Sequence, residues 1–124
     1  MKILACDDNH FLAKIIQLQL SKDNGGNVTV ATDGKEAMRL LTKENFDLLV
    51  LDLYMPYHSG FELLNYVRQQ LKLTTPVIML SSEGLDVTVK KAFELGANDF
   101  LAKPFDPATL LQRINQLLKH YEHA

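Results

Sequence analysis

The sequence predicts an α/β fold in which five β-strands form one parallel sheet with helices on both faces, a doubly wound (βα)5 arrangement. Three observations support this prediction. Short apolar runs alternate with amphipathic segments five times along the chain. The runs are almost continuously apolar, which is typical of strands that are covered on both faces. The 124 residues also suit one compact domain, so we expect residues 1–124 to form a single unit.

Each predicted strand is an apolar run, and the fifth run is the weakest of the set. The predicted strands are residues 3–6, 28–31, 48–51, 77–80 and 100–102. After each run comes a segment with apolar residues at helical spacing, which indicates a helix with one buried face. The predicted helices are residues 11–20, 35–41, 61–71, 87–95 and 110–118.

Turn and capping residues lie where these helices are expected to begin or end. Asp23-Asn24-Gly25-Gly26 is expected to end the first helix, and Asp33-Gly34 precedes the second. Gly96 follows the fourth helix, as a C-terminal cap does. Asp106 before Pro107 predicts an N-cap followed by the first helical residue of the fifth helix.

Charge and cysteine content restrict the function classes. Thirteen basic and fifteen acidic side chains give a net charge of −2, which argues against direct, non-specific binding to nucleic acid. Cys6 is the one cysteine, so an internal disulfide is impossible and a reducing compartment is expected. The apolar stretch near the start is too short for a signal-peptide core, and no stretch approaches a membrane span. We therefore expect a cytoplasmic protein without membrane contact.

Polar residues gather at one edge of the predicted sheet. Asp7 and Asp8 follow the first strand and Lys103 follows the fifth, whereas Asp52 ends the third strand and Ser81 ends the fourth. The carboxyl ends of parallel strands share one edge, which is where ligands bind in open α/β sheets. Three carboxylates placed together repel one another unless a cation lies among them. Carboxylate and carbonyl oxygens with retained water suit Mg²⁺, so a magnesium site is predicted there.

The same residues suit phosphoryl transfer. An aspartate can act as a nucleophile and form an acyl phosphate. That reaction needs mainly positioning and neutralisation of the charge on the phosphoryl oxygens. A metal held by Asp7 and Asp8, the Lys103 ammonium and the Ser81 hydroxyl could provide both around Asp52. The apolar run before Asp52 then carries the strand through the core and presents this acid at its end.

At these motifs the sequence resembles the receiver domain of two-component response regulators, across residues 2–120. The matching pieces are Asp7-Asp8-Asn9, Thr32-Asp33-Gly34, LVLDLYMP with Gly60 after it, VIMLSS and GANDFLAKPF. The resemblance implies that residues 1–124 form a single receiver domain with a flavodoxin-like sheet of strand order 2-1-3-4-5. It also implies a phosphoacceptor that catalyses its own phosphorylation and dephosphorylation, rather than an enzyme that acts on a separate substrate.

The resemblance also implies a role for each matching site residue. The implied metal ligands are Asp7, Asp8, Asp52 and the backbone carbonyl of Tyr54. Asp52 is also the implied phosphoacceptor, and Lys103 is the implied phosphate-binding lysine. The implied switch residues are Ser81, which supplies a hydroxyl, and the aromatic Phe100. The peptide bond between Lys103 and Pro104 is expected to be cis.

The implied partners are a phosphate donor and an output protein. The donor would be a histidine kinase or phosphotransfer protein, or a small acyl phosphate. The output would be a downstream partner protein or a missing C-terminal effector domain. It would use the face formed by the fourth helix, fifth strand and fifth helix.

Some positions depart from the pattern or allow a plainer interpretation. Ser82 stands where a small apolar residue is typical, and the loop Tyr57-His58-Ser59 lacks the usual small residues. Asp8 could be a helix N-cap and Phe100 a core residue. Tyr54 and Glu83 lie beside the expected path of attacking water, and the Tyr54 ring predicts a phosphoryl group that lasts minutes rather than seconds.

Two other functions are possible on this topology, but each needs residues that this sequence lacks. A metal-dependent aspartyl-phosphate phosphatase commonly needs a second acid two residues after the nucleophile, and Tyr54 occupies that place. A flavin-binding module of the same topology needs a hydroxyl- and glycine-rich phosphate loop after the first strand. Asp7-Asp8-Asn9 stands there, and its two acids would repel a flavin phosphate.

Overall fold

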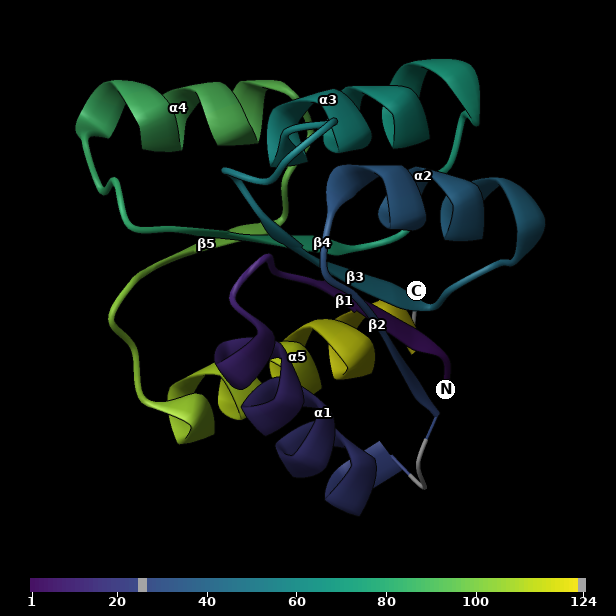
Figure 1. Ribbon diagram of the computed structural model, residues 1–124, viewed down its shortest axis with the longest axis vertical. Helices are drawn as coiled ribbons and strands as arrows, with labels where there is room; N and C mark the ends of the chain where they lie inside the picture. The colour runs from purple at the N-terminus through teal and green to yellow at the C-terminus, as the bar shows by residue number, and fades with distance from the viewer. Residues whose placement is uncertain (25–26, 123–124) are drawn as a thin grey trace.

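The computed structural model describes residues 1–24 and 27–122, which form one parallel sheet with helices on both faces (Figure 1). The strands are β1 (Ile3–Cys6), β2 (Val28–Ala31), β3 (Leu48–Asp52), β4 (Val77–Ser81) and β5 (Asp99–Ala102). The α-helices are α1 (His10–Asn24), α2 (Gly34–Lys43), α3 (Gly60–Asn65), α4 (Asp86–Glu94) and α5 (Pro107–Glu122). A π-helix, η1 (Tyr66–Gln70), continues directly from α3.

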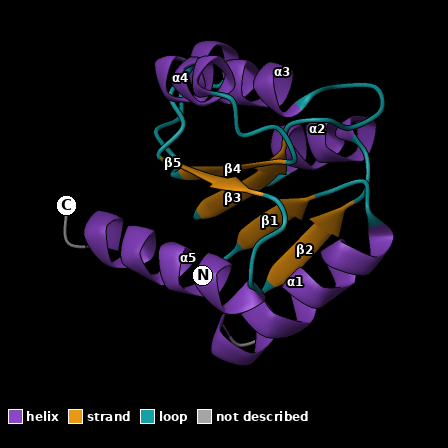
Figure 2. Ribbon diagram, turned by 90° about the vertical axis from the view of Figure 1, so that its left-hand side faces the viewer, coloured by secondary structure: helices purple, strands orange, loops and turns teal. Residues whose placement is uncertain are grey.

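The strand order is β2-β1-β3-β4-β5, and all four neighbouring pairs are parallel. Helices α1 and α5 cover one face of the sheet, and α2, α3 and α4 cover the other (Figures 1 and 2). The predicted doubly wound (βα)5 fold with order 2-1-3-4-5 is therefore confirmed. The strands all run in one direction, so their carboxyl ends meet at a single edge.

Alternate residues of each strand enter different halves of the core. In β1, Ile3 and Ala5 pack with α1 and α5, whereas Leu4 and Cys6 pack with α2, α3 and α4. All four are at most 1% exposed, which explains why this run is apolar at every position. Each large aliphatic side chain buried in this way contributes about 1.5–3 kcal/mol to folding, so both layers hold the sheet in place.

The helix ends follow the predicted capping residues. Asp33 Oδ1 accepts a hydrogen bond of 2.8 Å from Glu36 N at the start of α2. Asp106 Oδ1 accepts one of 2.9 Å from Ala108 N at the start of α5. Gly96 after α4 has φ = 108°, a conformation that glycine adopts without strain. Helix α1 ends at Asn24, and the predicted turn at Gly25 and Gly26 lies outside the described residues.

The structure corrects the third predicted helix, because residues 61–71 are not one regular α-helix. The α-helical part ends at Asn65, and Leu71 N then donates to Tyr66 O in the wider π pattern. From within this turn, Arg68 donates hydrogen bonds to the carbonyls of Gly96 and Leu73. These contacts join segments that are far apart in the sequence, so they cannot be predicted from the spacing of apolar residues.

Strands β3 and β4 include one polar residue beyond their apolar runs, and this residue ends each strand, as predicted. Asp52 is the last residue of β3 and Ser81 the last residue of β4. Both polar side chains are therefore held by the ends of buried strands. Among the described residues, no helix combines the length and apolar character that crossing a membrane requires.

Candidate functional site

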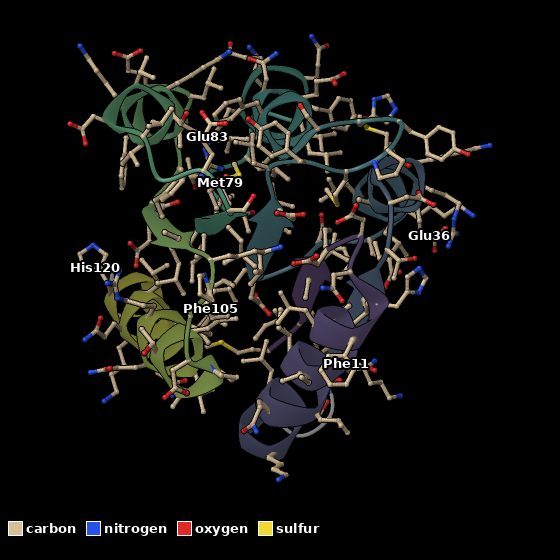
Figure 3. All side chains as sticks on the ribbon, turned by 60° about the vertical axis from the view of Figure 1, so that its left-hand side comes forward. Phe11, Glu36, Met79, Glu83, Phe105 and His120 are labelled. Carbon is tan, nitrogen blue, oxygen red and sulfur yellow. The ribbon has the colours of Figure 1, made fainter. Side chains whose placement is uncertain are left out.

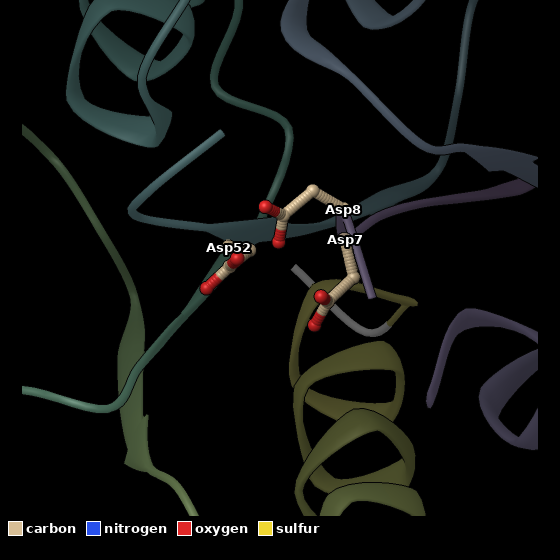
Figure 4. Close-up of side chains that lie close together, drawn as sticks. All are labelled: Asp7, Asp8 and Asp52. Atoms are coloured by element: carbon tan, nitrogen blue, oxygen red, sulfur yellow. The ribbon is translucent and has the colours of Figure 1, made fainter. Parts of the chain in front are cut away.

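Three carboxylates meet at the carboxyl edge of the sheet (Figure 4). Cys6 pairs with Leu51 across β1 and β3, so Asp7 and Asp52, the next residue of each segment, lie side by side. Asp7 is 1% exposed and Asp52 is 4% exposed, while Asp8 lies at the surface. One carboxylate oxygen from each of Asp7, Asp8 and Asp52 lies within 4.8 Å of the others. The predicted acidic cluster is therefore present.

Asn9, rather than Asp8, caps the first turn of α1. Asn9 Oδ1 accepts a hydrogen bond of 3.1 Å from Leu12 N, and Asp7 Oδ1 accepts one of 3.0 Å from Asn9 N. The capping contact is thus supplied by the neighbouring amide. The Asp8 carboxylate extends toward Asp7 and Asp52 instead (Figure 4).

Lys103 supplies the positive charge of the site. Its Nζ lies 2.8 Å from Asp7 Oδ2 and 3.2 Å from Asp52 Oδ1. Lys103 N also donates a hydrogen bond to Ser81 O, which joins the start of the loop after β5 to the end of β4. The Lys103–Pro104 peptide bond is cis, as predicted. The lysine thus reaches from β5 to the two most deeply buried acids of the cluster.

The electrostatics of the site bring the pKa of the Asp52 carboxyl close to neutral pH. Burial of its carboxyl and the charge of Asp7 raise the pKa of Asp52 to about 7, although Lys103 opposes this rise and Asp8 adds slightly to it. Burial on its own would lower the pKa of Lys103, but the hydrogen bonds and charges of Asp7 and Asp52 outweigh burial and raise it. One ammonium group therefore does not fully compensate the clustered acids.

The donor set suits a divalent cation. Among the side chains that the structure describes, in residues 1–22 and 27–120, Asp7 Oδ2 is the one buried oxygen or nitrogen that makes no hydrogen bond of regular geometry. The cluster supplies hard oxygen ligands from two buried acids, Asp7 and Asp52, and from the exposed Asp8. A divalent ion bound there would keep water on its exposed side, as Mg²⁺ does in proteins. A shallow groove of about 320 Å³ opens on the Asp8 side and is lined by Asp8, Tyr54, Met55, Pro56 and Ser59.

The loop after β3 returns closely against Asp52. Gly60 N donates to Leu53 O at 2.8 Å, and a Cβ atom at Gly60 would meet the Asp52 carbonyl oxygen at 2.5 Å. Only glycine permits this approach, which accounts for its place in the motif. The loop carries Tyr54, whose side chain is 54% exposed.

The two residues of the predicted switch lie at the ends of β4 and β5. Ser81 is fully buried, and its Oγ accepts a hydrogen bond of 2.9 Å from Glu83 N. Phe100 is half-buried and packs against the core layer beneath α2, α3 and α4. Both side chains are placed where a change of packing could occur. Their movement on phosphorylation stays a prediction.

Comparison with known proteins decides between the functions that the sequence left open. The sequence model of the response regulator receiver domain matches residues 3–115. The chain belongs to this family. The phosphatase alternative is not favoured, and receiver domains of this family bind a divalent metal in an acidic pocket such as the one formed by Asp7, Asp8 and Asp52.

Relatives and solved structures agree with this assignment. The receiver domain is 41% identical over 118 residues to the transcriptional regulatory protein CpxR of Escherichia coli (strain K12), covering 95% of this chain and 49% of CpxR. It is 36% identical over 123 residues to the alkaline phosphatase synthesis transcriptional regulatory protein PhoP of Bacillus subtilis (strain 168), covering 99% of this chain and 50% of PhoP. The chain therefore spans about half the length of these relatives. The solved receiver domain of Francisella response regulator 1452 superposes with a TM-score of 0.88 at 37% identity, covering 97% of this chain and 98% of that one.

The structure adds residues around the site that sequence reasoning missed. Thr88 in α4 bonds to Glu83, and no motif in the sequence indicates this contact. A groove of about 490 Å³ opens beside Lys103 between the start of α1 and the loop before α5. Phe11 and Phe105 line it from opposite sides (Figure 3), and Phe11 is 77% exposed. Phe11 begins the first predicted helix, but its exposure, which marks the groove, is visible only in the structure.

Proposed function

We propose that this receiver domain accepts a phosphoryl group on Asp52. The observation that carries the proposal is the placement of a buried carboxylate between a lysine and an acid pair. Asp52 lies 3.2 Å from Lys103 Nζ and shares a 4.8 Å cluster with Asp7 and Asp8. Residues 1–124 would act as a single receiver domain.

The site would catalyse its own phosphorylation through groups that this chain supplies. An Asp52 carboxylate oxygen forms a bond to phosphorus as the bond from phosphorus to the donor breaks. The electron pair leaves with the donor's imidazole nitrogen or carboxylate oxygen. Lys103 is placed to pair with one phosphoryl oxygen, and Ser81 to donate its hydroxyl to another. Lys103 is preorganised by its contacts with Asp7 and Asp52, whereas the Ser81 hydroxyl has to turn toward the phosphoryl group.

We infer that Mg²⁺ is the metal. Asp7, Asp8, Asp52 and the Tyr54 backbone carbonyl would hold it, together with water. Bound there, the ion would offset the negative charge of the acids and of the incoming phosphoryl group. Asp52 must lose its proton for either step, and its pKa of about 7 makes that loss easy near neutral pH.

The phosphate donor is a histidine kinase, a phosphotransfer protein or a small acyl phosphate. The apolar groove that Phe11 and Phe105 line opens next to Lys103, which makes it a suitable seat for a protein donor. The single buried thiol of Cys6, whose pKa is raised by burial and by Asp7 and Asp52, suits the reducing cytoplasm, where we place the protein.

The output would use the face formed by α4, β5 and α5. When Ser81 turns toward the phosphoryl group, space opens behind it and Phe100 can rotate inward, which shifts a population between two packed arrangements. A groove of about 440 Å³ runs along α4 and is lined by Val87, Lys90, Lys91, Glu94 and Leu95. The partner there is a downstream protein or an effector domain of the same polypeptide, and direct contact with nucleic acid is not expected.

The test is phosphorylation by acetyl phosphate with Mg²⁺, followed by intact-mass measurement. We expect one added phosphate in the wild type and none in Asp52→Asn. Asp47→Asn, which alters an exposed acid just before β3, is the matched control and should be labelled normally. Equal labelling of Asp52→Asn and wild type would overturn the proposal.

A further inference from the structure

Glu83 joins three segments at the carboxyl edge of the sheet. Tyr54 Oη donates a hydrogen bond of 2.5 Å to Glu83 Oε2, and Thr88 Oγ1 donates one of 2.6 Å to Glu83 Oε1. Tyr54 lies in the loop after β3 and Thr88 in the first turns of α4. Figure 3 shows Glu83 between β4 and α4. Each carboxylate oxygen therefore holds a hydroxyl from a different element.

The backbone of the same residue engages the buried hydroxyl at the end of β4. Glu83 N donates to Ser81 Oγ at 2.9 Å, and Ser81 is fully buried. Tyr54 in turn stands two residues after Asp52. A chain of hydrogen bonds thus runs from the segment after the acceptor, through Glu83, to the hydroxyl that faces the same edge. We call Tyr54, Glu83 and Thr88 the latch.

The latch has the features of a contact that fixes a loop. Hydrogen bonds to an ionised acceptor are stronger than those between neutral groups. The bonds from Thr88 and then Tyr54 lower the pKa of Glu83, so its carboxylate is ionised at neutral pH. Thr88 is only 7% exposed, which shelters its half of the latch from water. With both oxygens held, the Glu83 side chain cannot move without losing at least one bond.

We propose that Glu83 is a positioning residue, which holds Ser81 and the loop after β4 in the unphosphorylated arrangement. The inference rests on the proposed function, because it concerns access of the Ser81 hydroxyl to a phosphoryl group on Asp52. When that hydroxyl turns to the phosphoryl group, Glu83 N–H loses its acceptor and the residue has to shift. The two side-chain bonds oppose that shift, so they favour the resting population and weaken phosphoryl binding.

Two nearly isosteric substitutions test the latch. Tyr54→Phe removes the hydroxyl but keeps the ring, and Thr88→Val removes the other hydroxyl but keeps the side-chain shape. Beryllofluoride, a phosphoryl mimic, is titrated in Mg²⁺. Each variant should bind it roughly two- to tenfold more tightly than the wild type, which is the fold-change that one lost hydrogen bond produces. Tyr57→Phe removes an exposed hydroxyl from the same loop and should leave the affinity unchanged.

The two effects should also depend on Glu83. In a Glu83→Ala background, neither Tyr54→Phe nor Thr88→Val should change beryllofluoride affinity further, because both act through the same carboxylate. Affinity that is unchanged or weaker in the single variants, or gains that persist without Glu83, would overturn the proposal.

A second measurement does not depend on phosphoryl chemistry. Hydrogen exchange of the Glu83 amide is followed in metal-free protein, where this amide donates to Ser81 Oγ. Exchange should accelerate severalfold in Tyr54→Phe and in Thr88→Val but not in Tyr57→Phe. If exchange is faster in the two variants but not even the wild type binds beryllofluoride, the proposed function is refuted. The inference that Glu83 fixes the loop after β4 would then still stand. Unchanged exchange would refute the latch.

Discussion

Replacing Asp52 by Asn should stabilise the metal-free protein at neutral and alkaline pH. The wild-type carboxyl is 4% exposed, and burial with the charge of Asp7 raises its pKa from 3.8 to about 7. Between these two values the folded protein binds a proton that the unfolded chain has lost. The stability of the wild type therefore falls as the pH rises from about 4 to about 7 and is constant above that range.

The size of the effect follows from the same pKa. One pKa unit corresponds to about 1.4 kcal/mol, so a rise of about three gives a ceiling of about 4 kcal/mol. Water at the sheet edge reduces this value, and the introduced amide would still offer an oxygen to Lys103; we expect Asp52→Asn to gain about 2 kcal/mol at about pH 8. The gain should shrink steadily as the pH is lowered and vanish near about pH 4.

Urea unfolding with a chelator present measures the free energy of unfolding at each pH. Glu94→Gln is the control, because Glu94 is exposed on α4 and lies 3.9 Å from Lys90; it should change stability by less than about 0.5 kcal/mol. A gain from Asp52→Asn that is independent of pH, or that increases toward acid, would refute the electrostatic reasoning.

The remaining predictions concern the metal, the lifetime and the switch. Asp8→Ala should weaken Mg²⁺ binding at least severalfold by titration, since a surface carboxylate of the cluster is lost; unchanged affinity would remove Asp8 from the ligand set. Tyr54→Asn should speed the decay of phosphorylated protein, whereas Tyr54→Phe keeps the shielding ring; equal or slower decay in Tyr54→Asn would show that the ring gives no protection. Ser81→Ala should accept phosphate but fail to change partner affinity on the face formed by α4, β5 and α5; full switching in this variant would refute the coupling.

The fold was predictable because its signals are local. Strand β1 is buried on both faces, so every position is apolar, and the capping residues Asp33 and Asp106 mark helix starts within a few residues. The site was predictable for a related reason: parallel strands bring their carboxyl ends to one edge, and the strand order implied by the resemblance makes β1 and β3, and so Asp7 and Asp52, neighbours.

The features that sequence reasoning missed depend on contacts between distant segments. The π-helix carries Arg68, whose bonds to Gly96 and Leu73 become visible only when η1 and the end of α4 lie together. The bond between Thr88 and Glu83 likewise depends on how α4 is set on the sheet. The sequence allowed Asp8 to be a cap or a ligand, because acids are common at N-cap positions; the structure gives the capping contact to Asn9.

The central claim is that Asp52 is the phosphoacceptor, and mapping the phosphoryl group within the protein tests it most directly. Protein treated with acetyl phosphate and Mg²⁺ is reduced with borohydride, which converts an aspartyl phosphate to homoserine, and the peptides are then sequenced by mass spectrometry. The account predicts homoserine at position 52 of the wild type, and none when Mg²⁺ is withheld. Modification at Asp7 or Asp8 instead, or at no aspartate, would contradict it.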